Sequence, residues 1–246
     1  MADARDSSEA NEVAVLVPAA GEGSRLGGVR KQFRTLGDRP LLVQVLLVFE
    51  RHPTVGHLVV AVPEEHVREV SDRLQSEGLS KLSAVVSGGD SRQSSVRNAL
   101  RAVPAPVEVV LVHDAVRPFV QAGEVQRVVD AVRTHGAASL AMPVADTLRE
   151  AEGDTFGETV PRDGLYRMQT PQGFRRAWLE EAHRRAAEAD GMPATDDVGL
   201  VQRAGRSVHC VRGHRRNFKI TTKGDWTLAQ QLWGPWTNDP SRTATV

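Results

Sequence analysis

Cysteine is almost absent from this 246-residue chain, in which Cys210 is the only one. An internal disulfide and a metal site built from several cysteines are therefore excluded. Long apolar runs are missing too: Leu41–Phe49, which Gln44 interrupts, and Leu58–Val62 are far shorter than the ~20 residues that span a bilayer. The sequence therefore predicts no membrane-spanning helix.

An excess of charge of one sign is also lacking, because 31 basic side chains balance 31 acidic ones. This balance argues against a general nucleic-acid binder, which normally carries a basic excess. The first twelve residues, 1–12, are polar and acidic, unlike a signal peptide or a basic transit peptide. We expect a soluble, cytoplasmic protein that binds neither nucleic acid nor membrane.

Lysine is scarce, although basic residues are not. The 31 basic residues include only four lysines, at positions 31, 81, 219 and 223. Ammonium and guanidinium groups are not interchangeable at a binding site. Each lysine is therefore a candidate for a specific role.

Short apolar segments alternate with helical patterns over the first 142 residues. Helical spacing is clearest where Val96, Ala99, Leu100 and Val103 share one face. Strands separated by helices predict an α/β fold with a mostly parallel, Rossmann-like sheet covered by helices on both faces. The runs rich in β-branched residues that predict buried strands are Val13–Val17, Leu58–Val62, Leu82–Val86, Val109–His113 and Ser139–Met142.

This rhythm breaks after Pro143. Residues 144–172 show little periodicity and are too long for an ordinary loop, so we interpret them as an extended arm or hairpin that packs on another surface, such as that of a second subunit. The chain is predicted to be a single domain with this arm and with flexible tails at 1–12 and 234–246. The elements expected after the arm are a helix over Phe174–Asp190, a short helix from about Thr195, strands over Ser207–Val211 and Asn217–Thr221, and a helix over Gly224–Trp233.

The first predicted strand leads directly into a glycine-rich segment, Pro18-Ala19-Ala20-Gly21-Glu22-Gly23-Ser24-Arg25-Leu26-Gly27. It lacks the Gly-Lys-Ser/Thr of a P-loop, and Leu26 stands where a dinucleotide-binding fingerprint needs its third glycine. Small residues with Arg25 and Lys31 nearby suit a polyphosphate that is held and then split. The alternative is a tight turn with solvated basic side chains.

Two later strands also end in polar residues. Gly88-Gly89-Asp90 precedes a helix that Ser91 and Ser94 are expected to cap. His113-Asp114-Ala115-Val116-Arg117-Pro118 places a carboxylate and an arginine at the end of a strand, where open α/β sheets bind ligands. Asp114 could hold Mg²⁺ between substrate phosphates, or form an ion pair that closes the loop. His113 is expected to pack rather than to bind metal.

In this order, the segments resemble the 2-C-methyl-D-erythritol 4-phosphate cytidylyltransferase family of the non-mevalonate isoprenoid pathway. The resemblance runs from about Val13 to Trp233. It implies a homodimer in which each arm reaches the partner's site, and transfer of CMP from CTP to 2-C-methyl-D-erythritol 4-phosphate with Mg²⁺. The segments that carry it are Pro18–Arg25, Lys31-Gln32-Phe33, Gly88-Gly89-Asp90, His113–Pro118, Asp146-Thr147, Thr170-Pro171-Gln172 and Asn217–Thr221.

The resemblance also implies roles for individual residues. Arg25, Lys31 and Lys219 would be catalytic, neutralising charge on the triphosphate and at the α-phosphate. Asp114 would lie by the metal and the substrate hydroxyls. The residues implied for the nucleotide are Ala19, Ala20, Gly21, Gly23, Gly89, Asp90 and Ser95, and those for the sugar phosphate are Asp114, Arg117, Thr147, Arg162 and Thr170.

Two alternatives remain at this point. A ribitol 5-phosphate cytidylyltransferase would share the nucleotide loops and differ in the arm. A catalytically silent nucleotide-binding module would not need cations on both sides of the α-phosphate. In addition, Thr195-Asp196-Asp197 either belongs to the family pattern or is an ordinary helix cap.

Overall fold

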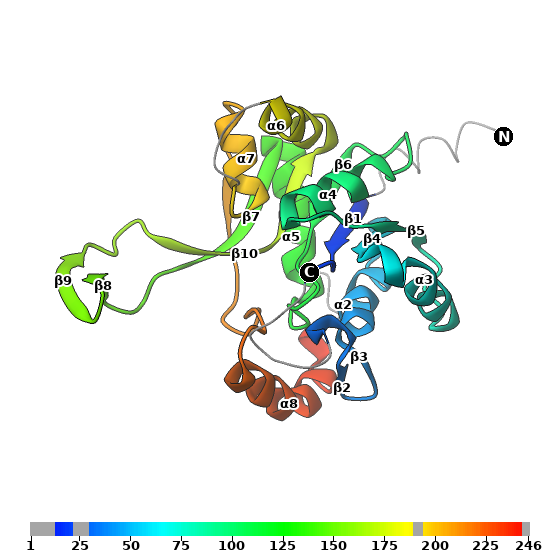
Figure 1. Ribbon diagram of the computed structural model, residues 1–246, viewed down its shortest axis with the longest axis horizontal. Helices are drawn as coiled ribbons and strands as arrows, with labels where there is room; N and C mark the ends of the chain where they lie inside the picture. The colour runs from blue at the N-terminus through cyan, green and yellow to red at the C-terminus, as the bar shows by residue number, and fades with distance from the viewer. Residues whose placement is uncertain (1–12, 22–29, 189–193, 243–246) are drawn as a thin grey trace.

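The computed structural model of the chain describes residues 13–21, 30–188 and 194–242. Its centre is a seven-stranded sheet in the order β11-β7-β10-β6-β1-β4-β5 (Figure 1). β10 is antiparallel to both of its neighbours, and the other pairs are parallel. The strands are β1 (Val13–Pro18), β4 (Val55–Val62), β5 (Leu82–Ser87), β6 (Val109–Val112), β7 (Ala137–Pro143), β10 (Tyr166–Arg175) and β11 (His209–Arg212).

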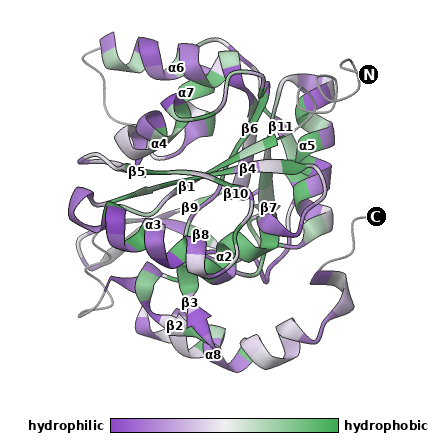
Figure 2. Ribbon diagram, turned by 90° about the vertical axis from the view of Figure 1, so that its right-hand side faces the viewer, coloured by the Kyte–Doolittle hydropathy of each residue, from purple (hydrophilic) through white to green (hydrophobic). Residues whose placement is uncertain are grey.

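Helices cover both faces of the sheet, which confirms the predicted α/β fold. Along β1 the side chains alternate: Val13, Val15 and Val17 pack with one set of helices, whereas Ala14 and Leu16 pack with the other. In Figure 2, α4, α6 and α7 lie above the sheet, and α2 and α3 lie below it. The first set is α2 (Leu41–Glu50), α3 (Val67–Ser76) and α5 (Ala122–His135), and the second is α4 (Arg92–Arg101), α6 (Arg176–Glu188) and α7 (Asp197–Arg203).

A smaller layer lies beside α2. Here α8 (Lys223–Thr237) packs on Phe119 and on a short hairpin, and Trp233 and Trp236 are buried against the Phe119 ring. The helix therefore runs past Gly234, where the sequence predicted a flexible tail to begin, because Trp236 is an apolar anchor. The remaining short elements are η2 (Lys31–Phe33), β2 (Thr35–Leu36), β3 (Arg39–Pro40), η3 (Glu64–His66) and η4 (Pro240–Arg242).

The predicted arm projects from the body as a two-stranded hairpin, β8 (Leu148–Glu152) and β9 (Thr155–Val160) (Figure 1). Its predicted end at residue 172 is wrong, because β10 already belongs to the central sheet from Tyr166 onward. The expected helix start at Phe174 is wrong for the same reason. Phe174 pairs with β6 and β7 and is fully buried, so α6 begins at Arg176.

The segment Asn217–Thr221, predicted to be a strand, pairs with none of the described strands. Its buried Asn217 side chain donates from Nδ2 to the Thr170 carbonyl (2.8 Å), and Ile220 N–H donates to the Val116 carbonyl (3.0 Å). These hydrogen bonds hold the segment against Thr170 on β10 and against the loop that contains Val116. As a result it carries Lys219 to the carboxyl ends of the strands.

None of the helices within the described ranges is long and apolar enough to cross a membrane.

Candidate active site

A cleft of about 810 Å³ opens at the carboxyl ends of β1, β4, β5 and β6. β1 is followed along the sheet by β4 and β5 on one side, and the chain then returns to place β6 on its other side. Such a change of direction is where open α/β sheets bind ligands. The cleft is lined by Pro18–Gly21, Arg30–Gln32, Pro63–Glu65, Ser87–Arg92, Ser95, Asp114–Val116, Lys219 and Thr221.

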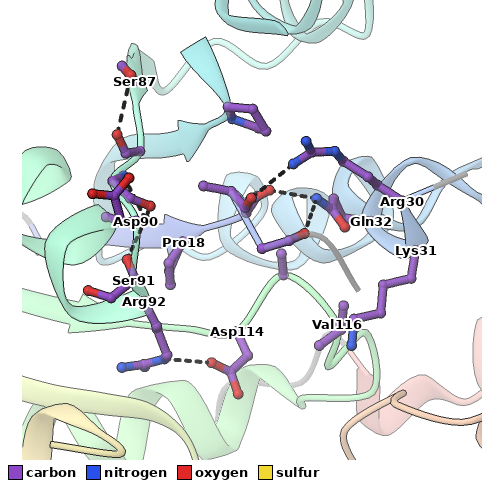
Figure 3. Close-up of a pocket in the computed structure, with 18 of the residues that line it drawn as sticks. Pro18, Arg30, Lys31, Gln32, Ser87, Asp90, Ser91, Arg92, Asp114 and Val116 are labelled. Carbon is purple, nitrogen blue, oxygen red and sulfur yellow. Dashed lines mark hydrogen bonds and ion pairs between the residues drawn. The ribbon is translucent and has the colours of Figure 1, made fainter. Parts of the chain in front are cut away.

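The turn after β1 is fixed through its carbonyl groups. Buried Gln32 donates from Nε2 to the carbonyls of Ala19 (2.7 Å) and Gly21 (3.2 Å), and Arg30 Nη1 donates to that of Ala20 (3.0 Å) (Figure 3). The side chains of Arg30 and Gln32 therefore fix the backbone of residues 19–21. Lys31, between them in sequence, lines the cleft as predicted.

The glycine pair after β5 allows close packing against this turn. A Cβ atom on Gly88 would lie 2.3 Å from the Ala20 Cβ, and one on Gly89 would lie 2.3 Å from the Ser94 Oγ. Ser91 caps α4 and exchanges hydrogen bonds with Ser94, which confirms the predicted cap. Only glycine permits the loop to lie this close to both neighbours.

Arg92, Asp114 and Lys219 form one side of the cleft, which we call the cationic wall, and Asp114 is the carboxylate at its centre. Its Oδ1 pairs with Arg92 Nε (3.2 Å), and its Oδ2 pairs with Arg117 Nε (3.3 Å) and Lys219 Nζ (3.2 Å). Burial alone would raise the pKa of Asp114, but the attraction of Arg92, Lys219 and Arg117 outweighs it and holds the pKa below its usual range. Asp114 is therefore ionised at neutral pH.

Arg92 also reaches a second carboxylate behind the cleft. Its Nη1 lies 2.7 Å from Oδ2 of the fully buried Asp197, the first residue of α7. Despite burial, the pKa of Arg92 is raised and that of Asp197 is lowered, because each stabilises the charge of the other. Asp196 caps α7 through Gly199 N–H (2.9 Å), which confirms the helix-cap interpretation for that residue.

His113 packs behind this wall, as predicted. Its Nε2 lies 3.0 Å from the Arg117 carbonyl and its Nδ1 lies 3.1 Å from the Thr170 hydroxyl, which also accepts from Asp114 N–H (3.1 Å). Burial lowers the pKa of His113 to about 4, so the ring is neutral at pH 7. With both ring nitrogens engaged, it is not placed to act as a base toward the cleft.

Most of the predicted site residues meet in this cleft, and a few lie elsewhere. Arg117 and Thr170 contact Asp114 from behind and do not line the cleft. Thr147 and Arg162 lie exposed on the arm, away from the cleft of their own chain, and Gly23 and Arg25 lie outside the described residues. The predicted residues that line the cleft are Ala19, Ala20, Gly21, Lys31, Gly89, Asp90, Ser95, Asp114 and Lys219.

Sequence reasoning missed Arg92, Asp197 and the loop-holding role of Gln32. Gln32 stands next to a predicted lysine, and Arg92 follows the helix cap, so both positions were close to recognised signals. Asp197 is 105 residues from its partner Arg92. No local pattern indicates a pair of that separation.

The described residues contain no group of three or more His, Cys, Asp and Glu side chains that could hold a metal ion. Asp114 is the carboxylate predicted for Mg²⁺, but both of its oxygens face cations. A metal on Asp114 would have to displace an ion pair. The chemistry of these donors does not fit a metal held by the protein alone.

Comparison with known proteins bears directly on this arrangement. The model of one protein family, 2-C-methyl-D-erythritol 4-phosphate cytidylyltransferase (IspD), matches residues 13–234. The chain belongs to this family. The cytidylyltransferase of that name from Salinibacter ruber is 68% identical over 230 residues, which cover 94% of this chain and 96% of that protein. The one from Deinococcus radiodurans is 44% identical over 225 residues, which cover 90% of this chain and 89% of that protein.

Solved structures of the same family share the fold. The crystal structure of 2-C-methyl-D-erythritol 4-phosphate cytidylyltransferase from Thermus thermophilus superposes with a TM-score of 0.77 at 39% identity, covering 91% of this chain and 99% of that one. Family membership therefore extends over the arm and the cleft as well as the central sheet.

Proposed function

We propose that this cytidylyltransferase transfers CMP from CTP to 2-C-methyl-D-erythritol 4-phosphate, giving 4-diphosphocytidyl-2-C-methyl-D-erythritol and pyrophosphate. The observation that carries the proposal is the cleft at the switch point, in a chain of this family. One wall is made of backbone and small side chains, and the other presents Arg92, Asp114 and Lys219. Such walls suit a base with its ribose and a triphosphate, respectively.

The nucleophile in this reaction is a phosphate oxygen of the sugar phosphate. It is already ionised at pH 7, so it attacks the α-phosphorus of CTP without a protein base. The new P–O bond forms as the bond to the pyrophosphate oxygen breaks, and no proton is transferred. The neutral, engaged state of His113 agrees with this chemistry.

Catalysis then consists of positioning and charge neutralisation. Lys219 and Lys31, on different segments lining one cleft, are proposed to stabilise the α-phosphate and the leaving pyrophosphate, together with Arg25. The nucleotide is proposed to bind the small-residue wall. The residues assigned to it are Ala19, Ala20, Gly21, Gly23, Gly89, Asp90 and Ser95.

Mg²⁺ is proposed to bind mainly to the phosphate oxygens of CTP, because Asp114 is already paired with three cations. When bound, the ion would neutralise phosphate charge. Asp114→Asn should lower kcat without raising the Mg²⁺ concentration that gives half-maximal rate. A large increase in that concentration would instead make Asp114 a metal ligand.

The sugar phosphate is proposed to bind between the cleft and the arm of a second subunit. Thr147, Arg162 and Phe156 (78% exposed) are exposed on the arm, and Tyr166 (51%) and Met168 (40%) are uncovered at the start of β10 in the single chain. We propose a homodimer in which Arg162 reaches the partner's cleft, where its planar fork suits a phosphate group. Asp114 would face the substrate, and Arg117 and Thr170 would hold Asp114 in place from the side away from the cleft.

The test is pyrophosphate release from CTP in the presence of Mg²⁺. It is measured in two separate reactions, one with 2-C-methyl-D-erythritol 4-phosphate and one with ribitol 5-phosphate as the co-substrate. The proposal predicts release with the first substrate and little with the second. Release with ribitol 5-phosphate alone would overturn the substrate assignment, and binding of CTP without release from either would indicate a silent module. As an enzyme that uses CTP, the protein is proposed to work in the cytoplasm.

A further inference from the structure

A chain of ion pairs connects the buried start of α7 with the cationic wall of the cleft. It runs from Asp197 on α7 through Arg92 on α4 to Asp114, and ends at Lys219. We propose that Asp197 is a positioning residue for the transfer reaction, acting through Arg92 on Asp114 and Lys219. The proposal rests on the proposed function and extends it to a residue outside the cleft.

The two contacts of Arg92 fix the orientation of its guanidinium. Its Nη1 donates to Asp197 Oδ2 at 2.7 Å, and its Nε donates to Asp114 Oδ1 at 3.2 Å. A planar fork held by two carboxylates has little freedom to rotate. Since the shorter bond is the one to Asp197, that residue is the anchor of the pair.

Asp197 is itself held rigidly to the sheet. Gln172, on β10, accepts from the N–H groups of Asp197 (3.1 Å) and Val198 (3.4 Å) through Oε1. Its Nε2 donates to Asp196 Oδ2 (2.8 Å). Both Gln172 and Asp197 are at most 1% exposed, so the anchor is fixed before any substrate arrives.

The opposite end of the chain points at the reacting groups. Asp114 Oδ2 holds Lys219 Nζ at 3.2 Å, and the Lys219 side chain is 41% exposed toward the cleft. If Arg92 is released, Asp114 can turn, and the Lys219 ammonium loses its fixed position. Misplacement of a catalytic group by about 1 Å can cost ~100-fold in rate.

Asp197→Asn tests this role because the amide keeps the shape of the side chain and removes its charge. The matched control is Glu124→Gln, a carboxylate-to-amide change at another buried residue (1% exposed), on α5 across the sheet. Asp197→Asn should lower kcat about 10- to 100-fold and change KM for CTP by less than about threefold. Glu124→Gln should leave kcat within about twofold, whatever it does to thermal stability.

A double-mutant cycle shows whether Asp197 acts through Arg92. In an Arg92→Met background, Asp197→Asn should cause no further loss of kcat. If the double variant lost kcat by the full product of the two single losses, the proposal would be overturned. Wild-type kcat in folded Asp197→Asn protein would also overturn it.

A readout without turnover separates this proposal from the proposed function. With four lysines in the chain, the signals of ¹³C-labelled lysine side chains can be assigned, using Lys219→Arg for Lys219. Asp197→Asn and Arg92→Met should both shift the Lys219 signal, and Glu124→Gln should not. An unmoved Lys219 signal in both variants would overturn the positioning role, whereas wild-type protein that releases no pyrophosphate would overturn only the proposed function.

Discussion

At the scale of single residues, the cleft concentrates positive charge around one ionised carboxylate. Arg92, Arg117 and Lys219 all contact Asp114, so each cation is held in place by the same anion. Arg117 is further fixed by the carbonyls of Asn217 and Met168. Only Lys219 among the three is substantially exposed, and it is therefore the one best placed to meet a phosphate.

Lys219→Ala should lower kcat by about 100-fold or more, because one preorganised cation at a reacting phosphate contributes ~3 kcal/mol to transition-state stabilisation. Affinity for CTP should change by less than about threefold. Lys223→Ala is the matched control, since this lysine is exposed at the first turn of α8. Steady-state kinetics with calorimetric CTP binding make the measurement, and equal kcat in the two variants would remove Lys219 from catalysis.

The lowered pKa of buried His113 makes the free energy of unfolding depend on pH. Its folded-state pKa of about 4 lies below the ordinary 6.5, so the unfolded chain binds the proton more tightly. The stability that comes from keeping this ring neutral and buried is present above pH 6.5 and is lost as the pH falls toward 4. Between pH 7 and pH 5 the free energy of unfolding should fall by about 2 kcal/mol more in the wild type than in His113→Asn. The measurement is chemical denaturation at each pH. If the free energy of unfolding fell equally with pH in the wild type and in His113→Asn, this prediction would be wrong.

The residues that sequence analysis could not find are those whose partners are distant in the chain. Lys31, Asp114 and Lys219 follow strands or familiar segments, and the structure brings them into one cleft. Asp197 was interpreted only as part of a family motif or a helix cap, because its pairing with Arg92 depends on how α7 packs on the sheet. Long-range ion pairs of this kind leave no local pattern.

At the scale of elements, the turn after β1 and the loop after β5 form one unit. Gly88 N–H donates to the Val62 carbonyl (2.7 Å), and Asn98 Nδ2 donates to the carbonyls of Ser87 (3.1 Å) and Gly88 (3.3 Å). The loop is therefore held between β4 and α4. Its separation from Ala20 sets the width of the small-residue wall.

Gly88→Ala should separate these two loops. The added Cβ would lie 2.3 Å from the Ala20 Cβ, which cannot move without its backbone. Such overpacking costs about 1–3 kcal/mol of stability, and we expect CTP affinity to fall by about tenfold. In Gly224→Ala, by contrast, the new methyl meets only Thr222 Oγ1 at 3.7 Å, so binding should be unchanged. Gly88→Ala protein that binds CTP as tightly as the wild type would contradict this prediction.

Element types were predictable where periodicity was strong, and boundaries were not. Six of the seven predicted strands correspond to strands of the sheet. β10 was divided between the arm and a helix because its antiparallel insertion between β6 and β7 is a tertiary event. Likewise Asn217–Thr221 has a strand-like composition but no neighbouring strand among the described ones, so buried polar contacts determine its path.

At the scale of the whole molecule, the arm is the feature that a single chain does not explain. The hairpin projects from the body (Figure 1), and Arg162 contacts the Ala145 carbonyl within the arm rather than any residue of the cleft. A site completed by a second subunit accounts for both observations. The sequence predicted the arm from its loss of periodicity, and the proposed second subunit would supply the surface on which the arm packs.

Subunit mixing tests the shared site. Arg162→Ala should chiefly raise KM for the sugar phosphate, by about 10-fold or more for a lost charge-assisted contact. Mixing it with Lys219→Ala should restore activity, because one of the two clefts in a mixed dimer then has both residues intact. The control is a mixture of Arg162→Ala with itself under the same exchange conditions. No recovery despite demonstrated subunit exchange would mean that Arg162 acts within its own chain.

In the proposed reaction, a phosphate oxygen of the substrate attacks CTP directly in this cleft. The most direct measurement uses 2-C-methyl-D-erythritol 4-phosphate labelled with ¹⁸O on its three terminal phosphate oxygens, with products followed by ³¹P NMR. Direct attack predicts that all three labels remain in the diphosphate product, one of them in its bridge, and that pyrophosphate carries none. Free CMP in place of the diphosphate, or label in the pyrophosphate, would contradict it.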